Sequence, residues 1–425
     1  MSEITSSSPE QEAQGAISTH KVDCCIVGAG PAGAMLALLL ARKGISVMLL
    51  EKQMDLDRKF RGDSVHPSTM NILDQLGLAE KVLQLRHTKV DHVTFPLPDG
   101  TTSTVDIGHV LKKAGSRYPY MIMLPQVLFL EFLTNEASRY ANFHLVLGAR
   151  VEELVEENGQ IQGIRYRLHE SGHDSKHEVR ALLTVGADGR FSRMRQLAGF
   201  TPIKTSPPMD VLWYDIPRYP GDPEDLQANI KNGHIAILLN HFDHWQGGYV
   251  IPKGSYQQFH AAGLEALQSS LADMLPLLAD RVHCLQSWQQ ISLLSVESSR
   301  LPCWHRPGLL LIGDAAHVMS PVAGVGINYA IQDTVVAANI LSQPLKEGQM
   351  SDDLLARVQR RRELPTRLIQ GLQAQMQKRI VQNALQSGEV FHAPLILRVL
   401  ASISLTKTLL VRFVMLGLWP VHLKD

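Results

Sequence analysis

The chain has 425 residues, which is enough for two or three domains with sizeable cores. Its 41 basic and 41 acidic residues leave no formal net charge, which argues against a nucleic-acid partner and against electrostatic attachment to a membrane surface. The four cysteines follow neither a disulfide nor a metal-ligand spacing, and no run of 18 uncharged apolar residues occurs, so neither a metal site nor a transmembrane helix is predicted.

Residues 1–20 are rich in Ser, Glu and Gln and lack the basic start and apolar core of a secretory signal. We predict that they form a disordered tail on a cytoplasmic protein. The neutral charge balance favours a small molecule as the partner of the folded part.

A strand, helix and strand predicted over residues 21–51 carry the most specific motif of the chain. The first strand runs into Gly28-Ala29-Gly30-Pro31-Ala32-Gly33, which matches G-x-G-x-x-G, and an apolar helix follows directly. Gly28 permits a tight turn, Gly30 lets the backbone approach a pyrophosphate, and Gly33 lets the helix pack on the strand. The helix N-terminus then faces the phosphate charge. Incidental glycines in a structural strand–turn–helix unit are the alternative.

An acidic residue closes the second strand of this unit. Glu51, followed by Lys52, lies 18 residues after Gly33, near the roughly 20-residue spacing at which a carboxylate accepts hydrogen bonds from ribose hydroxyls. Because a carboxylate there would repel a 2'-phosphate, the expected nucleotide is FAD or NAD.

The next elements alternate between helices and strands. Residues 66–86 have helical periodicity with a break at Gly77, and residues 91–107 predict two strands around the turn Pro98-Asp99-Gly100. A helix is predicted from Gln126 to Tyr140. Strands dominate from Phe143 to Val185, with a hairpin turn at Glu157-Asn158-Gly159.

A second strand-rich region is predicted from about residue 205 to 252, and helical patterns follow it. The strand at 309–312 returns the chain to a dinucleotide-type fold. From about residue 351 the sequence is helical and basic, and it ends in an apolar stretch from Pro394 to Leu423 that basic residues interrupt.

A second motif follows the strand at 309–312. The strand delivers Gly313-Asp314 at its carboxyl end, where open parallel sheets bind ligands, and Asp314 could hold sugar-like hydroxyls. A turn with Pro321, Gly324, Gly326 and Asn328 could bring backbone N–H groups against a flat ring, and a helix N-terminus near Gly326 would face developing negative charge. The alternative for Asp314 is a helix N-cap.

A third motif, Gly186-Ala187-Asp188-Gly189, lies between a strand and the start of a basic helix. Such a turn suits phosphate, although a solvated turn leading to a surface helix is an equal alternative.

The three motifs, in this order, resemble the p-hydroxybenzoate hydroxylase class (group A) of FAD-dependent monooxygenases over most of residues 21–345. The resemblance implies an α/β fold of the GR2 type, in which a Rossmann-like FAD-binding domain is joined to a strand-rich substrate domain and a C-terminal helical region. The expected boundaries are 21–200 and 296–345 for the FAD-binding domain, 201–295 for the substrate domain and 346–425 for the helical region. The strands at 91–107 can join the substrate domain.

The resemblance also implies roles for individual residues. The first motif would hold the FAD pyrophosphate, Glu51 the adenosine ribose, and Asp314 the ribityl hydroxyls. Asp188 would lie beside the dinucleotide. Arg61 and Gln126 look like the family's basic and amide residues near the cofactor. The residues implied in cofactor binding are Gly28, Gly30, Pro31, Ala32, Gly33, Glu51, Lys52, Arg61, Gln126, Asp188, Gly313, Asp314, Pro321, Gly324, Gly326 and Asn328.

The chemistry that the resemblance implies is the cofactor's own. NAD(P)H reduces FAD, O2 adds to form a C4a-hydroperoxide, and the oxygen is transferred to an aromatic, polyketide or quinone-like substrate. We expect the thioredoxin-like C-terminal domain of the larger phenol hydroxylases to be missing. The segment from Trp213 to Pro217 only loosely matches the halogenase signature W-x-W-x-I-P, since the second Trp is missing.

Several alternatives stay open. A dehydrogenase, reductase or halogenase could use the same scaffold, and a non-catalytic flavin-binding protein is a further possibility. The apolar and basic C-terminal stretch either packs as a helical lid or contacts a membrane peripherally. No catalytic residue is assigned. Tyr214, His234 and Trp245 are the candidate substrate contacts, on strands predicted to form a lid over the flavin.

Overall fold

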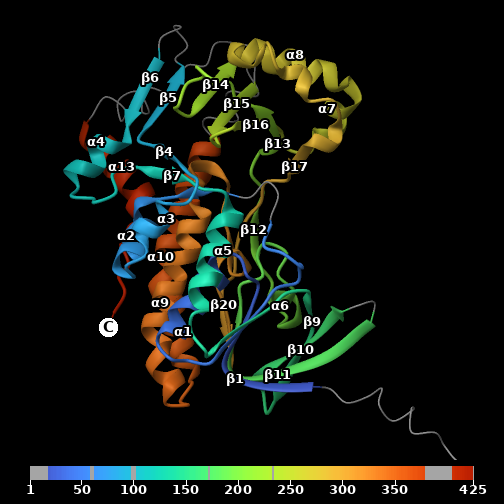
Figure 1. Cartoon of the computed structure of the whole chain (residues 1–425), viewed down its shortest axis with the longest axis vertical. Helices are drawn as coiled ribbons and strands as arrows, with labels where there is room; N and C mark the ends of the chain where they lie inside the picture. The colour runs from blue at the N-terminus through green and yellow to red at the C-terminus, as the bar shows by residue number, and fades with distance from the viewer. Residues whose placement is uncertain are drawn as a thin grey trace, which may run out of the picture.

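The computed structural model describes residues 18–57, 62–96, 102–170, 173–231, 234–378 and 404–424. Figure 1 shows a sheet crossed by long helices at one end of the molecule and a second sheet, capped by α7 (Tyr256–Ala262) and α8 (Leu264–Met274), at the other.

The central sheet is mainly parallel and has the order β19-β20-β11-β1-β2-β8. Its strands are almost continuous apolar runs, because parallel strands are covered on both faces. Helix α1 (Pro31–Arg42) packs against α5 (Gln126–Ala137) and α9 (Gly326–Lys346) (Figure 1). The strand bounds are β1 Ser18–Val27, β2 Val47–Leu50, β8 Phe143–Val146, β11 His173–Gly186, β19 His305–Arg306 and β20 Leu309–Leu311.

The first strand begins earlier than the sequence predicted. Residues 18–20 pair with β11 at His177–Val179, so they belong to the sheet and not to the expected tail. The length of β11, which has 14 residues, gives these positions a partner that composition alone does not reveal. Residues 1–17 lie outside the described residues.

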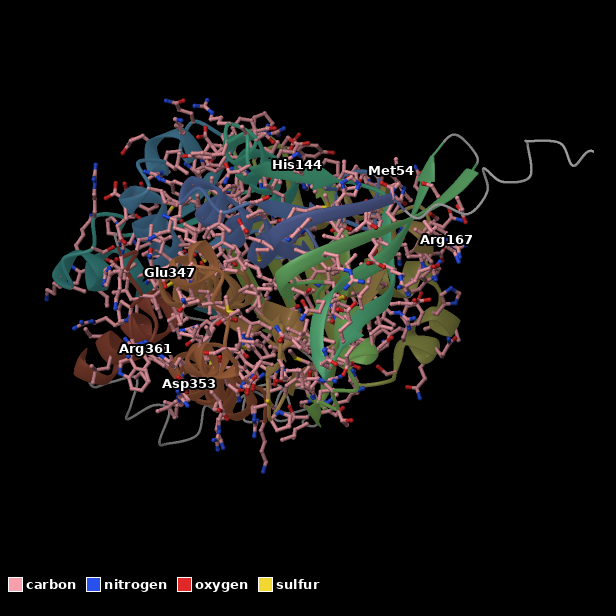
Figure 2. The ribbon with its side chains drawn as sticks, turned by 90° about the horizontal axis from the view of Figure 1, so that it is seen from below. Met54, His144, Arg167, Glu347, Asp353 and Arg361 are labelled. Atoms are coloured by element: carbon pink, nitrogen blue, oxygen red, sulfur yellow. The ribbon has the colours of Figure 1, made fainter. Side chains whose placement is uncertain are left out.

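A long antiparallel arm extends from β11. Strands β9 (Ala149–Glu157) and β10 (Gln160–Glu170) are joined at Asn158 and Gly159, whose φ angles of 51° and 78° suit the tight hairpin turn that the sequence predicted. Figure 2 shows Arg167 on this arm, where its guanidinium contacts the carboxylates of Glu152 and Asp174 at 3.1 and 2.9 Å.

Short elements fill the space between the two main sheets. Strands β3 (Ser64–Val65), β7 (Met121–Met123) and β4 (Thr88–Val90) form one small sheet. The helical region at 66–86 is broken as predicted, because Gly77 takes a φ of 73° between α2 and α3. The remaining bounds are α2 Pro67–Gln75, α3 Ala79–Val82, β5 His92–Pro96, β6 Thr102–Asp106 and α4 Ile107–Lys113. The turn predicted at Pro98-Asp99-Gly100 lies outside the described residues.

The second main sheet is antiparallel, with the order β14-β15-β16-β13-β17. Its two faces alternate along each strand. Leu212 and Tyr249 belong to the face covered by α8, which we call the helix-covered face. Val211 and Val250 belong to the opposite face, where they pack with Val322 from the chain before α9; we call this the open face. The strand bounds are β13 Met209–Pro217, β14 Gln227–Lys231, β15 His234–Asn240, β16 His244–Pro252 and β17 Ile291–Leu294.

The C-terminal region packs on the rest of the fold. Helix α10 (Asp352–Met376) lies against α9 and β19, and a small sheet of β12 (Ile203–Thr205), β18 (Ser298–Arg300) and β21 (His317–Val318) lies near it. Met415 of α13 (Ser404–Leu416) is buried with Ile107 and Leu111 of α4. Within the described part of the chain, no helix is long and apolar enough to cross a membrane.

Candidate functional site

Three glycines of the first motif do different physical work. Gly28 has a φ of +102°, and a Cβ there would lie 2.6 Å from the carbonyl oxygen of Ala187. A Cβ on Gly33 would lie 1.8 Å from the carbonyl oxygen of Gly28. A Cβ on Gly30 would meet no protein atom within 4 Å. Two glycines therefore allow backbones to touch, and the third leaves open space at the start of α1.

The start of α1 has the features of an anion site. Gly30 is the N-cap residue and no side chain caps the helix, while Pro31 and Ala32 begin the first turn. Uncapped N–H groups at a helix N-terminus favour phosphate. Next to them, the buried Glu51 carboxylate accepts hydrogen bonds from the N–H groups of Ala29 and Gln53, each at 2.9 Å. This cradle therefore fits a dinucleotide. Lys52, the next residue, is exposed.

The second motif meets the first in space. Gly313 follows β20 with a φ of +57°, and a Cβ there would lie 3.2 Å from the Cβ of Ala32 and 3.3 Å from that of Ala330. Its N–H donates to the Oδ2 of Asp333 at 3.1 Å. The neighbouring Asp314 is half-buried in a short 3-10 helix, Gly313–Ala315, at the carboxyl end of the strand. The carboxylate is thus held at the edge where β1 and β2 also end.

Asp333 is the centre of a fully buried ionic group behind this edge. Its Oδ2 accepts a hydrogen bond from the Nε2 of His317 at 2.6 Å, and its Oδ1 accepts one from the Nε of Arg362 at 2.8 Å. These two partners hold the pKa of the Asp333 carboxyl below its ordinary value although burial acts to raise it. A charged pair therefore supports Gly313 from α9 and α10.

The third motif joins the same edge through its backbone, because the Ala187 N–H donates to the Val27 carbonyl at 2.8 Å and the Gly186 carbonyl accepts from the Ile312 N–H at 3.0 Å. Arg195 of α6 (Arg193–Leu197) donates to the carbonyl oxygens of Asp314 and Ala315 at 3.4 and 3.1 Å. Asp188 lies beside the first motif, since a Cβ on Gly28 would lie 2.6 Å from the Asp188 Cα. Its carboxylate accepts hydrogen bonds from the Oγ of Ser192 at 2.5 Å and the N–H of Met194 at 3.0 Å, so its side chain binds the start of α6, whose N-cap residue is Ser192. Burial raises the pKa of this carboxyl.

The turn before α9 has a constrained backbone. Pro321 precedes a 3-10 helix, Val322–Gly324, in which Ala323 and Gly324 take φ angles of 64° and 60°. A Cβ on Gly324 would lie 2.2 Å from the Oγ of Ser64, which donates to the Gly324 carbonyl at 3.0 Å. Only glycine fits this approach. Helix α9 starts two residues later at Gly326.

Asn328 was expected to line the flat ring, and its side chain is hydrogen-bonded to protein groups on both sides of the turn. Its amide oxygen accepts from the N–H of His66 and the Oγ1 of Thr69, and its amide nitrogen donates to the carbonyls of Ser64 and Gly324. An amide side chain can make four hydrogen bonds, and all four here go to protein groups. Asn328 therefore ties β3 and α2 to the turn before α9.

Gln126 secures the segment that precedes β3. Its N–H donates to the Oδ1 of Asp63 at 2.9 Å, and its Nε2 donates to the carbonyl of Gly62 at 3.0 Å. These two bonds hold the segment at Gly62 and Asp63, which lies between the turn before α9 and the second main sheet. Arg61, which the sequence placed near the cofactor, lies outside the described residues.

Asp63 is a buried carboxyl at the border between the two main sheets. The Nε2 of His241 lies 3.5 Å from its Oδ2, and the Gln246 side chain on the open face forms a hydrogen bond with it. Burial, and to a lesser degree the Asp215 carboxylate, raise the pKa of Asp63 to about 7, against the opposing effects of the Gln126 N–H, His244 and Gln246. A group with this pKa exchanges a proton near neutral pH.

His241 comes from the turn between β15 and β16. Burial, and then the nearby His244, lower the pKa of His241 to about 4, so its imidazole is neutral at pH 7. Its Nε2 is buried and has no hydrogen-bond partner within the described residues. The turn is strained at Phe242, whose φ is 74°, and Arg86 holds it by lying over the Phe242 ring and by pairing with Asp243 at 2.7 Å.

The open face of the second sheet lies toward this carboxyl. Gly248 on β16 lies between Trp213 on β13 and Ile237 on β15, its two cross-strand neighbours. The side chains of Trp213 and Ile237 are only half-buried. A Cβ on Gly248 would lie 2.9 and 3.0 Å from atoms of Ile237 and Trp213. The missing side chain at Gly248 thus leaves an apolar surface on which the indole can lie.

The three aromatic or imidazole candidates of the sequence analysis lie on the other face. Tyr214 and Trp245 are fully buried in the core under α8, and the ring of His234 stacks on that of Tyr249 at a centroid distance of 5.3 Å. The indole N–H of Trp245 donates to Asp222 at 3.0 Å. Their placement differs from the expectation of substrate contact, because strand alternation turns them away from the face that holds Gln246.

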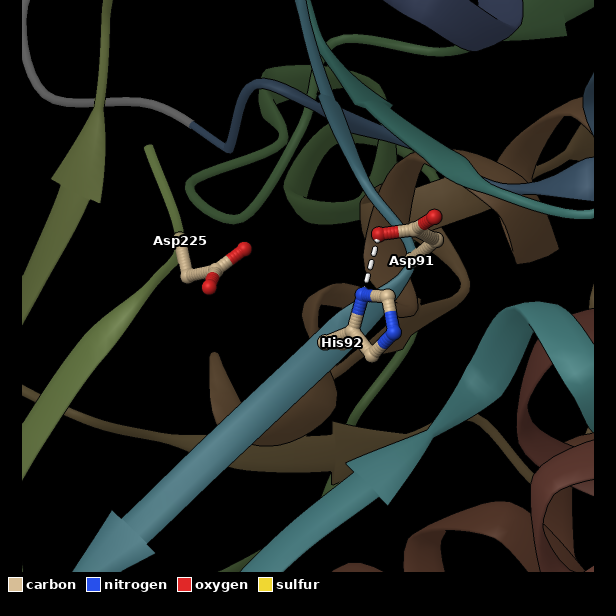
Figure 3. Close-up of side chains that lie close together, drawn as sticks. All are labelled: Asp91, His92 and Asp225. Carbon is tan, nitrogen blue, oxygen red and sulfur yellow. Dashed lines mark hydrogen bonds and ion pairs between the residues drawn. The ribbon is translucent and has the colours of Figure 1, made fainter. Parts of the chain in front are cut away.

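A separate polar cluster joins β5 to β14. Asp91, His92 and Asp225 place ligand-type atoms within 4.8 Å of one another, and Figure 3 shows the hydrogen bond of 2.5 Å between His92 and Asp91. Asp225 is exposed, and Leu226 forms a bridge with Val93. This cluster fits an ion-paired joint between the two strands.

Asp63, His241 and Gln246 were missed by sequence reasoning. Asp63 lies in Arg61-Gly62-Asp63-Ser64, a segment that drew attention only through its arginine. Trp213 and Asp215 flank Tyr214 on the same strand, and they lie on the opposite face of the sheet from it. The signal that could have decided between the faces is the helical pattern after residue 256, because those helices must cover one side of the sheet.

The sequence matches a profile described as "FAD binding domain" over residues 21–371. A 6-methylpretetramide 4-monooxygenase from Streptomyces rimosus is 34% identical over 373 residues, which cover 87% of this chain and 85% of that relative.

Solved structures show the same fold at lower identity. The anhydrotetracycline hydroxylase OxyS from Streptomyces rimosus has a TM-score of 0.71 and 21% identity, covering 93% of this chain and 76% of that one. PqsL, a probable FAD-dependent monooxygenase from Pseudomonas aeruginosa, has a TM-score of 0.71 and 20% identity, covering 86% of this chain and 97% of that one.

Proposed function

Since the chain belongs to the FAD-binding-domain family and is a flavin-dependent monooxygenase, we propose that it hydroxylates a flat, polyketide-like aromatic substrate with NAD(P)H as reductant. The 34% identity to a 6-methylpretetramide 4-monooxygenase supports this substrate class. The observation that carries the proposal is the position of Asp63, a carboxyl with a pKa of about 7 between the turn before α9 and the open face.

The residues of the cradle fit FAD. The open space at Gly30 and the uncapped start of α1 suit the pyrophosphate, Glu51 suits the adenosine ribose, and Asp314 suits the ribityl chain. The turn from Pro321 to Gly324 would lie along the flavin ring. When bound, FAD supplies two-electron reduction and the activation of O2.

The open face supplies the surface for the substrate. Trp213, Ile235 and Ile237 present half-buried apolar side chains there. Binding sites for flat apolar molecules are built from such surfaces with a few polar groups at one end. Asp63 and Gln246 are those polar groups, so an aromatic hydroxyl would be oriented toward them while the ring lies on Trp213.

Asp63 then acts on the substrate hydroxyl as a general base. Loss of the hydroxyl proton to the Asp63 carboxylate raises the electron density of the ring carbons ortho and para to the oxygen, which makes them better acceptors of an electrophilic oxygen. The opposing influences on its pKa keep this carboxyl near the pH at which such exchange is efficient. Gln126 and Gln246 hold the carboxyl in place by hydrogen bonds.

The decisive test compares wild type with Asp63→Asn. The amide keeps the shape and cannot accept the proton, so kcat should fall about 100-fold, while the flavin spectrum and FAD affinity stay unchanged. The limb of the kcat profile near pH 7 should disappear. Unchanged kcat and pH profile in this variant would remove Asp63 from the reaction.

The assay itself separates the rival reactions. Substrate-dependent NAD(P)H oxidation with one atom of ¹⁸O₂ incorporated into an aromatic product supports hydroxylation. Reduced product without oxygen would indicate a reductase, product halogenated in the presence of halide would indicate a halogenase, and the absence of any turnover across polyketide and phenolic substrates would favour a flavin-binding protein.

A further inference from the structure

The buried side of α10 carries a row of polar residues beside its apolar row of Leu355, Val358 and Ile369, which is unusual for a helix at a protein core. Its inward positions recur every three or four residues, and each is at most 8% exposed. A helix normally places apolar residues at that spacing. In Figure 2, Asp353 and Arg361 mark other positions of the helix, and both are exposed. The inward polar residues are Gln359, Arg362, Thr366, Gln370, Gln373 and, just after the helix, Gln377.

Gln359 and Gln370 bind main-chain groups of the segments that pack against α10. Gln359 accepts from the N–H of Trp304 and donates to the carbonyl of Pro302, both at 2.9 Å. Gln370 donates to the carbonyls of Ser299 and Val318 at 2.9 and 3.0 Å, across two strands of the small sheet.

The last two glutamines bind the turn before α9. The Nε2 of Gln373 donates to the carbonyls of Ser320 and Val322 at 2.9 and 2.8 Å. The Nε2 of Gln377 donates to the Oγ of Ser320. These bonds hold a segment that contains the left-handed Ala323 and that has no regular strand or helix pairing of its own beyond a single 3-10 turn. Left-handed alanine is costly and persists where neighbouring contacts fix it.

We propose that Gln373 and Gln377 are positioning residues that fix the Ser320–Gly324 turn against the flavin ring, so that α10 is part of the flavin site. The inference rests on the placement of this turn along the ring under the proposed function. Gln373 restrains the carbonyls at the start and in the middle of the turn, those of Ser320 and Val322, and Gln377 adds a restraint through the Ser320 hydroxyl. The side of the turn opposite α10 is held by Asn328 and Ser64, so the turn is clamped between two layers.

Holding the turn in this way should affect the bound flavin, whereas a helix that only stabilised the fold would not. The turn carries peptide dipoles whose direction at the ring depends on its conformation. If Gln373 sets that conformation, its loss must change the absorption spectrum and the reduction potential of the bound flavin. Loss of Gln359, another buried glutamine nearer the start of α10, must leave both unchanged.

The experiment compares Gln373→Leu with Gln359→Leu. Both variants lose two hydrogen bonds to the main chain and gain a similar apolar side chain, so both should lower the melting temperature. Only Gln373→Leu should shift the flavin absorption bands and the reduction potential, and it should weaken FAD binding about 10-fold or more, which is what the net loss of one to two hydrogen bonds gives. Spectral and redox changes of equal size in the two variants would overturn the proposal.

A milder pair keeps the test decisive should Gln373→Leu not fold. Gln377→Met and Ser320→Ala each remove one side of the same contact, and the two changes should be non-additive in their effect on FAD affinity. Additive effects would overturn the role of Gln377. Wild type that fails to bind FAD would instead refute the proposed function, whereas wild type that binds FAD and hydroxylates, with an unaltered Gln373 variant, would refute this inference alone.

Discussion

The dinucleotide cradle and the open face of the second sheet are built in opposite ways. The cradle consists of backbone: Gly28, Gly33 and Gly313 let segments touch, and Gly30 leaves space. The open face consists of side chains from separate strands, among them Trp213 and Gln246, together with Asp63 from the chain before β3. Changes in the cradle should therefore act on folding and FAD, and changes on the open face on substrate.

The two sites therefore differ in which substitutions they tolerate. A backbone cradle depends on the absence of side chains at fixed points, so almost any replacement at Gly33 is harmful. A face made of alternating side chains accepts replacements one position at a time, because the neighbours on the helix-covered face keep the core intact.

The largest expected effect contrasts two glycines of one motif. Gly33→Val places carbon atoms inside the carbonyl of Gly28, whose oxygen lies 1.8 Å from an added Cβ, so soluble folded protein should be lost. Gly30→Ala meets no protein atom, and its φ of −71° suits alanine. It should fold with an unchanged melting temperature and lose FAD affinity about 10-fold or more, because the pyrophosphate needs that space. Thermal melts without FAD and titration with FAD check both. Normal FAD affinity in Gly30→Ala would contradict the role of Gly30 in leaving space for the pyrophosphate.

The next effect concerns the charged support of the cradle. Asp333→Ala leaves the buried Arg362 unpaired and the Gly313 N–H without its acceptor, so the free energy of unfolding should fall by about 5 kcal/mol. Denaturant titration measures the loss. Glu363→Ala, on the same helix as Arg362 and half-buried, is the control and should change stability by less than about 1 kcal/mol. Similar losses in the two variants would show that the buried Asp333–Arg362 pair contributes no more to stability than an exposed ion pair.

The pH dependence of stability tests Asp63. Its pKa is raised in the folded protein to about 7, so this carboxyl favours folding fully below about pH 4 and loses that contribution as the pH rises to 7 and above. Asp63→Asn lacks this loss. Its stability relative to wild type should therefore increase between pH 4 and 8, by up to about 4 kcal/mol. Urea titrations of both proteins at several pH values measure the difference, and parallel curves would contradict the raised pKa.

The smallest effect separates the two faces at adjacent residues. Gly248→Ala presses on Ile237 and Trp213, so the KM for an aromatic substrate should rise about 3- to 10-fold with little change in melting temperature. Gly247→Ala presses its Cβ to 2.1 Å from the Tyr214 ring in the core, and should lower stability by about 1 to 3 kcal/mol with KM nearly unchanged. Exchanged outcomes would mean that the substrate lies on the helix-covered face.

The sequence predicted the cradle well because its signals are local. Gly28, Gly33 and Glu51 act within one strand–helix–strand unit, and the turn at Asn158-Gly159 needs only its own φ angles. The bonds of the Asp188 side chain to Ser192 and Met194 were not predicted, because a turn that suits phosphate and a turn beside a helix start contain the same residue types. The bonds of Asn328 were not predicted because its partners, His66 and Thr69, are more than 250 residues away.

The open face could not be predicted because it depends on pairing between strands. Tyr214 and Trp213 have the same propensities, and only the position of α8 decides which of them is core. Asp63 and His241 meet across 178 residues of chain, and neither has a local motif. Burial at the meeting point, which shifts both pKa values, is a property of the assembled structure.

Under the proposed function, the strict alternation of β13 and β16 limits how this protein can change its substrate over evolutionary time. A single-residue insertion or deletion in either strand would exchange core and open-face positions from that point onward. New specificities can therefore arise through substitutions at every second residue, whereas changes in strand length would disrupt the core. The turn at His241–Asp243, which Arg86 holds by its contacts with Phe242 and Asp243, joins β15 to β16 and fixes the register between these two strands.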